Sequence, residues 1–436
     1  MNAADIGPVP PEKRTQSGAD LFLIYAGANI VATTLVTGAS LVPAFSTAAA
    51  LVLIAVGSVL GAGLVAALAP LGPRFGAPSV IIARAALGLR GAQFLAVLLY
   101  LTNFAWIALN NVIAASACAR IWGGPGAERL WAVGLGLAAT AVVALGPRAV
   151  GWADRLAVPV MAAIGLLLLV RCFGLPSVTF TASGEGSLGL LRGLDVVVGY
   201  QVSWILMFAD YSRYTQGEGR SALAVFLGLA LTSLWFMPLG LLAARAAGSS
   251  DPGALMSVLG LGASGALLMA LATLTTNFVN IYLSALAFKS LRPATSPGLS
   301  VWSIGAVGAL LSLLSQAWLD RYADFMLVLG SLLVPAGGIL LARFFLLRRP
   351  VDVSALYQAP LGATRGLGLP AALAWGLGSV VYFAAAPIGG TLPALLTAML
   401  AYVLFTTKTQ RTQRNGYEQR NHRGTETQRN DPHITQ

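Results

Sequence analysis

The stretch Val196–Tyr214 reads VVVGYQVSWILMFADYSRY, and the interpretation of the whole chain starts from it. It begins apolar, becomes polar from Gly199 to Ser203, continues with Trp204 and ends with the polar and aromatic run Asp210–Tyr214. A helix that only crosses lipid needs no polar interior, because polar groups at membrane depth are costly and usually face a cavity or a partner. The stretch therefore predicts a discontinuous membrane helix whose freed backbone groups bind a substrate or an ion. The alternative is a continuous helix whose small residues pack against a neighbouring helix.

The composition of the whole chain is that of a polytopic membrane protein. Of its 436 residues, 57% are hydrophobic and 10% are charged, and the mean hydropathy is +0.76. Apolar runs long enough to cross a bilayer recur along the sequence. The first residues are polar, so we expect no cleavable signal peptide. The net charge of +11 comes from basic residues spread over short loops, which argues against a nucleic-acid partner.

Twelve membrane spans are expected, and an even number places both termini on the same side of the membrane. They cover residues 19–43, 46–69, 91–119, 130–146, 156–173, 192–212, 221–246, 264–288, 299–317, 323–346, 369–386 and 391–406. This arrangement puts 21 of the 27 Lys and Arg residues on the side of the termini. The other six are Arg120, Arg129, Arg171, Arg192, Arg245 and Arg321. By the positive-inside rule, we expect a multi-pass protein of the inner (plasma) membrane with both termini in the cytoplasm.

The first ten spans divide into two blocks of similar length, residues 19–173 and 190–347. Because each block holds five spans, the second block must be inverted relative to the first. Each block opens with a polar-interrupted span, and in the first block the interruption is Gly27–Asn29 followed by Thr33 and Thr34. Paired interruptions at corresponding positions of two halves point to the central site of a transporter.

The remaining segments flank these two blocks. We expect residues 1–18 to form a cytoplasmic tail and residues 369–406 to form two peripheral helices. Residues 407–436 are rich in Gln, Arg, Asn and Thr, and this composition predicts a disordered cytoplasmic tail. The expected fold is therefore an all-α membrane protein of about twelve helices. It has a five-plus-five inverted repeat, discontinuous helices 1 and 6 and two extra C-terminal helices.

The third span carries three polar or aromatic residues at helical spacing. Asn103, Trp106 and Asn110 follow the pattern i, i+3, i+7 and lie on one helical face. An aromatic plane one turn from a carboxamide could bind a flat heterocycle, because the ring stacks and the amide hydrogen-bonds to the heterocycle's edge. The alternative is that Trp106 packs in the bundle and the two Asn side chains bond to neighbouring helices.

The eighth span contains a second polar face. Thr276, Asn280 and Ser284 repeat every four residues, and Asn277 borders that face. Hydroxyls and helix carbonyls are hard oxygen ligands that suit a small cation such as Na⁺. The alternative is that the Thr hydroxyls bond back to carbonyls one turn earlier in the same helix.

The acidic residues at the ends of the sixth span are Asp195 and Asp210. Asp210 lies three residues before Arg213, so a local ion pair is its expected role, with proton coupling as the alternative. No acidic residue stands out in the middle of a span, which favours Na⁺ over a carboxyl-based proton relay.

Reactive side chains are scarce in the membrane body. Cys118 and Cys172 both lie in apolar runs, so we expect free buried thiols and no disulfide. Both histidines, His422 and His433, lie in the C-terminal tail, so no imidazole is available in the spans. The lack of histidine and of clustered acidic residues there argues against an integral membrane enzyme.

Taken together, these stretches resemble the nucleobase:cation symporter family, especially its cytosine permease and hydroxymethylpyrimidine transporter branches. The resemblance covers about residues 19–347 and depends on the order and spacing of several motifs. These are Gly27–Asn29, Leu35–Gly38, Gly72–Gly76, Arg84, Gly88, Arg90, Gly91, Trp106, Asn110, Ser203, Trp204, Asp210–Tyr214, Thr275–Asn277 and Tyr282.

The resemblance implies the five-plus-five fold and an aromatic sandwich of Trp106 and Trp204 around a heterocycle. It also implies that Asn110 contacts the base. Some members of the family carry an Asn at the position of Ile281, so here either Asn277 or Asn280 substitutes for it or the substrate is bound differently. The expected substrate-binding set is Trp106, Asn110, Trp204, Asn29, Gln201, Asn277 and Asn280. The cation site implied for sodium-coupled members corresponds to Ala28, Val31, Ala272, Thr275 and Thr276.

The expected function is import of a nucleobase or related pyrimidine, such as cytosine, by symport with Na⁺ or H⁺. No other cofactor is expected, and the lipid bilayer and a small heterocycle are the expected partners of a monomeric protein. Import of hydroxymethylpyrimidine, or of an amino acid or amine on the same fold, is the alternative within the class of transporters. A sensor that binds without transporting is the alternative outside that class.

Overall fold

The computed structural model describes residues 6–124, 126–173, 184–248, 262–314, 322–358, 366 and 368–409. Within these residues the structure is helical, apart from one isolated bridge between Gln16 and Thr215. Cys118 is a free, buried thiol, as expected. The side chain of Cys172, both histidines and the expected tail from residue 410 onward lie outside the described part of the chain.

The described helices overlap the ranges expected for membrane spans, although the number twelve stays a prediction. They are α1 (Gly18–Asn29), α2 (Ala32–Ala39), α3 (Thr47–Leu68), α4 (Leu71–Phe75), α5 (Ser79–Trp122), α6 (Ala127–Ala144), α7 (Pro147–Phe173), α8 (Leu190–Val202), η2 (Ile205–Met207), η3 (Ser212–Tyr214), α9 (Glu218–Ala247), α11 (Gly262–Leu291), α12 (Pro297–Leu311), η4 (Ser312–Leu314), α14 (Tyr322–Leu341), η5 (Ala342–Leu346), α15 (Val353–Tyr357), α16 (Leu369–Ala384) and a last helix, Thr391–Thr409. In the described residues, ten helices are long and apolar enough to cross a membrane, and the bent pair α1–α2 makes up to eleven. The remaining expected span is α16, which is apolar but shorter.

The first span is broken where the sequence predicts it. A capping box starts α1, since the Ser17 hydroxyl accepts a hydrogen bond from the Asp20 backbone and the Asp20 carboxylate accepts one from the Ser17 backbone. After α1, Val31 is fully extended, with φ −140° and ψ 160°, and α2 leaves at an angle of 59°. The β-branched pair Ile30 and Val31 favours this extended linker. The break leaves carbonyl groups at the end of α1 without helical partners.

The sixth span is also broken, but later than the polar residues suggest. Its first part, α8, continues through Gly199–Gln201 and ends at Val202. A turn at Ser203 and Trp204 follows, and the chain then continues in short 3₁₀ segments. The Ser203 hydroxyl donates to the Tyr200 carbonyl at 2.7 Å, which satisfies one carbonyl at the helix end. Of the polar residues, Gly199–Gln201 thus precede the break, and Ser203 lies in it.

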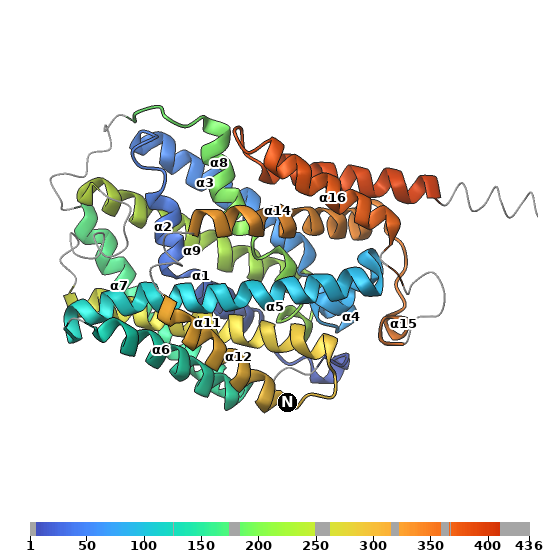
Figure 1. Ribbon diagram of the computed structural model, residues 1–436, viewed down its shortest axis with the longest axis horizontal. Coiled ribbons are helices and arrows are strands. Elements are labelled where there is room, and N and C mark those ends of the chain that lie inside the picture. The colour runs from blue at the N-terminus through green and yellow to red at the C-terminus, as the bar shows by residue number, and fades with distance from the viewer. Residues whose placement is uncertain are drawn as a thin grey trace, which may run out of the picture.

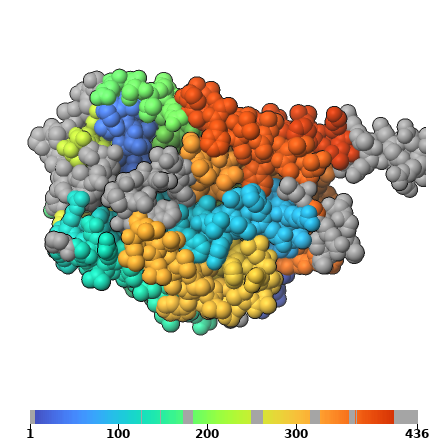
Figure 2. All heavy atoms as spheres, in the orientation of Figure 1, coloured from blue at the N-terminus to red at the C-terminus, as the bar shows by residue number. Residues whose placement is uncertain are grey.

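Three pairs of helices pack side by side to build the body of the molecule (Figure 1): α5 with α11, α3 with α9, and α6 with α12. Each pair joins the helices that occupy the same place in the two expected blocks. This pairing is what an inverted repeat would produce, although the repeat itself stays a prediction. α16 packs on α14, and with the last helix it forms one edge of the molecule, drawn in red in Figures 1 and 2.

The third helix is longer than the expected span 91–119. α5 starts at Ser79 and bends at Gly88, which has φ 73° and ψ 176°. Only glycine adopts this backbone conformation without strain. A side chain there would also collide with the Gly366 carbonyl. Before the bend, the Arg84 side chain donates to the Leu356 carbonyl at 2.8 Å, so the start of α5 contacts α15.

The outer surface of the helices is apolar. Leu130, Leu145 and Leu156 are 78%, 79% and 68% exposed, and many other large apolar side chains point outward. In water such an extended apolar surface would promote association. On a chain with this many long apolar helices it is the surface that contacts lipid.

Candidate functional site

The two helix breaks meet α5 and α11 at a small central pocket. Its lining residues are Val31, Thr33, Trp106, Asn110, Tyr200, Ser203, Trp204, Met207, Thr276 and Asn280. The pocket has a volume of about 30 Å³, which is room for water molecules only. Discontinuous helices supply backbone groups and short side chains at such a point, while the continuous helices supply a fixed wall. We refer to this set of residues as the central pocket.

Asn110 is the most informative residue of the central pocket. It is 1% exposed, and neither its Nδ2 nor its Oδ1 has a hydrogen-bond partner. Buried amides in folded proteins are normally bonded, and an unsatisfied one costs about 1–3 kcal/mol. The backbone carbonyl of Asn110 accepts from Thr273 at 3.0 Å, so the residue is held in place while its side chain is left free. The pocket therefore offers one donor and one acceptor to a ligand.

Aromatic rings form much of the remaining surface. Trp106 lies one turn before Asn110 on α5, and Trp204 lies in the turn after α8. The Trp204 ring packs against Tyr25, with ring centroids 6.3 Å apart. Tyr25 is itself fixed, because its hydroxyl donates to the Met207 carbonyl at 2.9 Å. Both expected tryptophans thus line the same pocket, from different helices.

Three of the expected substrate-binding residues lie elsewhere. Asn29 and Gln201 both donate to the Ser233 hydroxyl on α9, at 2.8 Å and 2.5 Å. Asn277 donates to the Asn111 side chain at 2.8 Å. These amides have helix partners and do not line the central pocket. Their amide groups bond to side chains of neighbouring helices, and their expected contact with a substrate stays a prediction. Helical spacing alone does not show which neighbouring helix each of these side chains faces.

Asn280 does line the central pocket, and Asn277 supports it. The Asn280 amide donates to the Asn277 Oδ1 at 3.4 Å, so Asn277 helps to hold the Asn280 side chain in place. Of the two substitutes considered for the position of Ile281, the structure thus places Asn280 at the pocket. Asn103, the third member of the polar face on α5, is buried with both amide atoms unpartnered but does not line the pocket.

Sequence reasoning did not select four lining residues as site residues: Thr33, Tyr200, Ser203 and Met207. The polar pattern of the two interrupted spans includes the first three, so the signal was present. The Tyr200 hydroxyl lies 2.6 Å from the Thr34 hydroxyl, which ties α8 to α2. Met207 carries no comparable signal, since an apolar residue in a membrane span is unremarkable in sequence.

The residues expected to hold a cation come together beside the central pocket. The Thr275 hydroxyl donates to the Gly27 carbonyl and to the Ala272 carbonyl, both at 3.1 Å. The Thr276 hydroxyl donates to the Ala28 carbonyl at 3.0 Å. The break after α1 leaves the carbonyls of Gly27 and Ala28 available for these contacts. The Val31 carbonyl begins α2, where it accepts from the Thr34 backbone at 3.0 Å.

This cluster of neutral oxygens fits a small hard cation. Carbonyl and hydroxyl oxygens are the ligand types that such ions prefer, and the hydroxyls could turn their protons away to coordinate. In the described residues there is no group of His, Cys, Asp and Glu that could hold a transition metal. The donor set thus suits Na⁺ better than a multivalent ion.

The acidic residues of the sixth span have structural partners. The Asp210 carboxylate accepts a hydrogen bond from the Ser79 backbone at 3.1 Å. Arg213 instead donates to the hydroxyls of Tyr214 and Tyr282, at 2.7 Å and 3.3 Å. The expected ion pair between Asp210 and Arg213 therefore stays a prediction. The N-terminus of α5 competes for the carboxylate, as helix N-termini favour anions.

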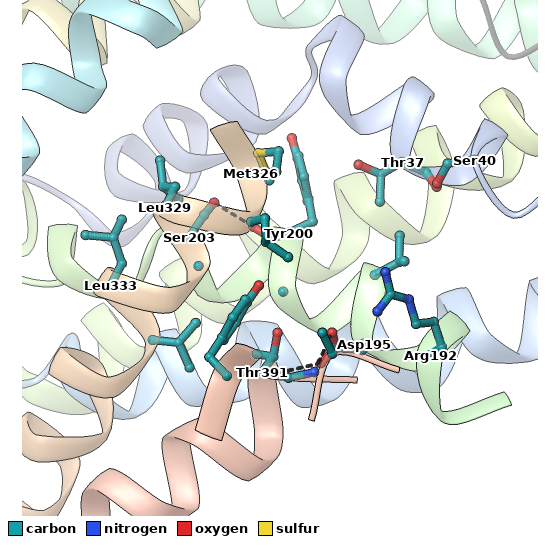
Figure 3. Close-up of a pocket in the computed structure, with 18 of the residues that line it drawn as sticks. Thr37, Ser40, Arg192, Asp195, Tyr200, Ser203, Met326, Leu329, Leu333 and Thr391 are labelled. Atoms are coloured by element: carbon teal, nitrogen blue, oxygen red, sulfur yellow. Dashed lines mark hydrogen bonds between the residues drawn. The ribbon is translucent and has the colours of Figure 1, made fainter. Parts of the chain in front are cut away.

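A wide cavity opens on one side of the central pocket (Figure 3). It has a volume of about 340 Å³ and shares Tyr200 and Ser203 with the central pocket. Asp195 lies in its wall and accepts hydrogen bonds from the backbone of Gly390 and Thr391, at 3.1 Å and 2.7 Å. This carboxylate thus anchors the start of the last helix. We call this space the Asp195 cavity.

A second cavity, of about 380 Å³, lies on the opposite side and is lined by Asp154, the N-terminal segment, α1, α7 and α11. We call it the Asp154 cavity. A closed contact separates it from the central pocket. That contact includes Ile24 and Tyr211, which also line the Asp154 cavity, and Trp204 and Met207, which also line the central pocket. It has no room for a water molecule. The three spaces therefore lie in series across the molecule.

Comparisons with known proteins agree with this architecture. A family model described as permease for cytosine/purines, uracil, thiamine, allantoin matches residues 8–404. The chain is similar to the cytosine permease of Escherichia coli (strain K12), with 25% identity over 388 residues, 84% of this chain and 88% of that protein. Among solved structures, Mhp1, a nucleobase-cation-symport-1 family transporter, is similar in fold. Its closed conformation with bromovinylhydantoin bound gives a TM-score of 0.80 at 20% identity, covering 94% of this chain and 96% of that chain. Its inward-facing conformation gives 0.76 with the same identity and coverage.

Proposed function

The chain belongs to the family of permeases for cytosine/purines, uracil, thiamine and allantoin, and we propose that it imports a nucleobase-like heterocycle by symport with a cation. The observation that carries this proposal is the unpartnered amide of Asn110 in a pocket that also holds Trp106 and Trp204. Such a site can stack a flat ring and bond to its edge at the same time. The protein is thus a permease and not an enzyme.

The ligand is proposed to lie between the two tryptophans with its polar edge toward Asn110 and Asn280. An amide presents both a donor and an acceptor, which matches the alternating edge groups of a pyrimidine such as cytosine. The same edge is present in the aminopyrimidine ring of hydroxymethylpyrimidine, so that compound is the second candidate substrate. An amino acid has no flat ring edge to satisfy Asn110, and its carboxylate would need a donor cluster instead.

Transport is proposed to follow alternating access between the two cavities. In the present conformation the central pocket is too small for a base, and the contact through Ile24 and Tyr211 closes one side. On the other side, Tyr200 and Ser203 stand between the central pocket and the Asp195 cavity. Movement of the helix halves around the breaks would open one side at a time, as in other carriers with discontinuous helices. With both termini in the cytoplasm, the Asp195 cavity faces outward and the Asp154 cavity faces the cytoplasm.

The coupling ion is proposed to be Na⁺, held by the carbonyls of Ala28, Val31 and Ala272 and the hydroxyls of Thr275 and Thr276. An ion there would link the end of α1 to α11, the two elements that border the central pocket. Because bound cation and bound base then favour the same arrangement of helices, each raises the affinity of the other. The donor chemistry of this cluster, which contains no titrating group, is the reason for preferring Na⁺ to H⁺.

The decisive experiment is a ligand-stabilisation panel with the purified protein in detergent. Melting temperatures are measured with cytosine, uracil, adenine, hydroxymethylpyrimidine and phenylalanine, in NaCl and in choline chloride. A ligand that binds the folded state raises the melting temperature. We expect an increase with at least one pyrimidine, and a larger one in NaCl. If no base stabilises the protein in either salt while phenylalanine does, the substrate class is wrong.

A further inference from the structure

The Asp154 cavity has features that its position on an exit route does not explain. Its volume of about 380 Å³ far exceeds the 30 Å³ of the central pocket, so it is the space on this side that can hold a ring-shaped ligand. It is bordered by α1, α7, α11 and the segment around Tyr211, the elements that would separate during opening. A cavity that only lets a substrate diffuse out needs to be wide enough for it and filled with water. This cavity is also lined by polar groups that bond to no described residue: the carboxyl of Asp154, a buried residue, and the buried amide oxygen of Gln16.

Asp154 is the first of these groups. It is 6% exposed, and it makes no hydrogen bond and no ion pair with any described residue. The other carboxylate of the cavity, Asp20, pairs with Arg155 at 3.0 Å. Lys13 also lines the cavity but does not bond to Asp154. The Oε1 atom of Gln16 is a second buried group without a partner in the same wall. Since buried polar groups are costly when unsatisfied, the arrangement indicates a ligand that supplies donors.

Aromatic rings supply the rest of the lining. Tyr211 and Tyr282 lie with ring centroids 5.0 Å apart and planes tilted by 40°, and Phe278 and Tyr214 are close by. The cavity thus repeats the combination found in the central pocket, where two aromatic rings accompany one unpartnered polar side chain. Aromatic faces stack on heterocycles whatever their substituents. The polar group adds selectivity, because it bonds only to a heterocycle whose edge carries complementary hydrogen-bonding groups.

We propose that the Asp154 cavity is a second binding site for an uncharged planar heterocycle with an exocyclic amino group, such as a 4-aminopyrimidine. The Asp154 carboxyl accepts a hydrogen bond from one N–H of the amino group, and Gln16 Oε1 accepts a second one from its other N–H. This inference rests on the proposed function and extends it. A base that leaves the central pocket past Trp204 and Tyr211 is held in the Asp154 cavity before its release.

The test is the number and specificity of binding sites on the purified full-length protein, measured by equilibrium dialysis with radiolabelled cytosine. The wild type should bind two cytosines per chain with different affinities. Asp154→Asn should weaken the lower-affinity site by about tenfold, because a neutral amide oxygen accepts the hydrogen bond more weakly than a carboxylate does. The other site should change by less than twofold. Asp352→Asn is the control, because its carboxylate lies outside the cavity and accepts a hydrogen bond from the Ser354 backbone, and it should leave both sites unchanged.

Two further measurements isolate the cavity. In the Trp106→Ala/Trp204→Ala double variant, weak cytosine binding should persist and should disappear when Asp154→Asn is added. Pyrimidin-2-one, which lacks the amino group, should compete poorly for this weak site. A wild type that binds one cytosine, with Asp154→Asn unchanged, would overturn the second site and leave the proposed function intact. A wild type that binds no base in any salt would overturn both. Equal competition by pyrimidin-2-one would overturn the role of Asp154.

Discussion

Asn110 and Asn29 have the same side chain and nearly the same burial, yet their surroundings differ completely. The Asn29 amide donates to Thr232 at 2.7 Å and to Ser233 at 2.8 Å, whereas the Asn110 amide has no partner. The first amide links two helices, and the second is available to a ligand. The Oδ1 atom of Asn29 and both amide atoms of Asn103 also lack partners, so an unpartnered amide indicates ligand binding only where it also lines the pocket, as Asn110 does.

This contrast gives a prediction with a built-in control. Asn110→Leu should not lower the melting temperature of the ligand-free protein, because it removes an unsatisfied buried amide. It should change the ranking of bases in a binding panel, since the edge contacts that discriminate among them are lost. Asn29→Leu should do the opposite, lowering the melting temperature and preserving the ranking. An unchanged ranking in Asn110→Leu would remove this residue from the binding site.

The two tryptophans give the second prediction. Stacking of a heterocycle on an aromatic face contributes about 1–3 kcal/mol. Trp106→Ala and Trp204→Ala should each weaken binding of the base by roughly 5- to 150-fold, at about 1.4 kcal/mol per tenfold. Trp→Phe at either position should lose much less, because a ring face remains. Isothermal titration of folded variants measures the effect, and wild-type affinity in both alanine variants would show that the rings only pack.

The sequence identifies some of these residues and not others for a physical reason. Helical spacing correctly groups Trp106 with Asn110, because both positions follow from the geometry of one helix. Asn29, Gln201 and Asn277 were predicted to bind substrate, but each turns toward a partner on another helix. The identity of that partner depends on how helices pack, which no local pattern contains.

At the scale of elements, the break after α1 and the middle of α11 form one unit. The break frees the carbonyls of Gly27 and Ala28. The hydroxyls of Thr275 and Thr276 on α11 donate to these carbonyls. Neither element could form this cluster alone, since a continuous α1 would use its own carbonyls within the helix. The proposed cation site therefore lies at a contact between two helices, and binding of an ion there depends on the distance between them.

The third prediction tests this contact. Thr276→Ala removes one hydroxyl and should weaken Na⁺ binding, and by linkage it should reduce the effect of Na⁺ on base affinity by the same factor. Thr276→Ser keeps the hydroxyl and should restore both. Ser290→Ala is the control on the same helix, because its hydroxyl donates to its own helix at the Ala287 carbonyl. Base affinities measured at several Na⁺ concentrations give the factor, and a Thr276→Ala protein with unaltered Na⁺ dependence would refute the assignment.

The positions of the two helix breaks also show how far a break can be located from the sequence. The first lies next to Gly27–Asn29, as predicted, because the following β-branched residues favour an extended backbone. The second lies after Val202, although the polar residues Gly199–Gln201 suggested an earlier start. Those residues stay helical because Gln201 bonds to α9 and Gly199 allows close approach of Thr391. Tertiary contacts thus stabilise a helix that local pattern would end.

At the scale of the whole molecule, backbone hydrogen bonds attach the N-terminal segment to distant parts of the chain. The Val9 backbone donates to the Gly76 carbonyl at 2.8 Å, and the Gln16 backbone donates to the Tyr214 carbonyl at 3.0 Å. Tyr357 donates to the Ile6 carbonyl at 2.8 Å. These backbone contacts attach residues 6–16 across three distant parts of the chain. A polar sequence gives no sign of them, because they use main-chain atoms.

The fourth prediction concerns orientation. The excess of Lys and Arg on the side of the termini predicts that both lie in the cytoplasm. A C-terminal fusion to green fluorescent protein should therefore fluoresce, and a fusion to alkaline phosphatase at the same position should be inactive. The reverse pattern would invert the molecule, and the Asp154 cavity would then face outward.

The last prediction tests alternating access through the two cavities. Ser40→Cys places a thiol in the Asp195 cavity, and Gly151→Cys places one in the Asp154 cavity, where an added side chain meets no atom. Both are made in a Cys118→Ser/Cys172→Ser background, and labelling by a membrane-impermeant maleimide is followed from each side. In a carrier, the contact through Ile24 and Tyr211 does not open at the same time as the barrier at Tyr200. We therefore expect no condition to raise the labelling rates of both cysteines. Adding Na⁺, cytosine or both should raise at most one of them. A condition that speeds both reactions would indicate a continuous pore, and the molecule would then be a channel with a binding site and not a symporter.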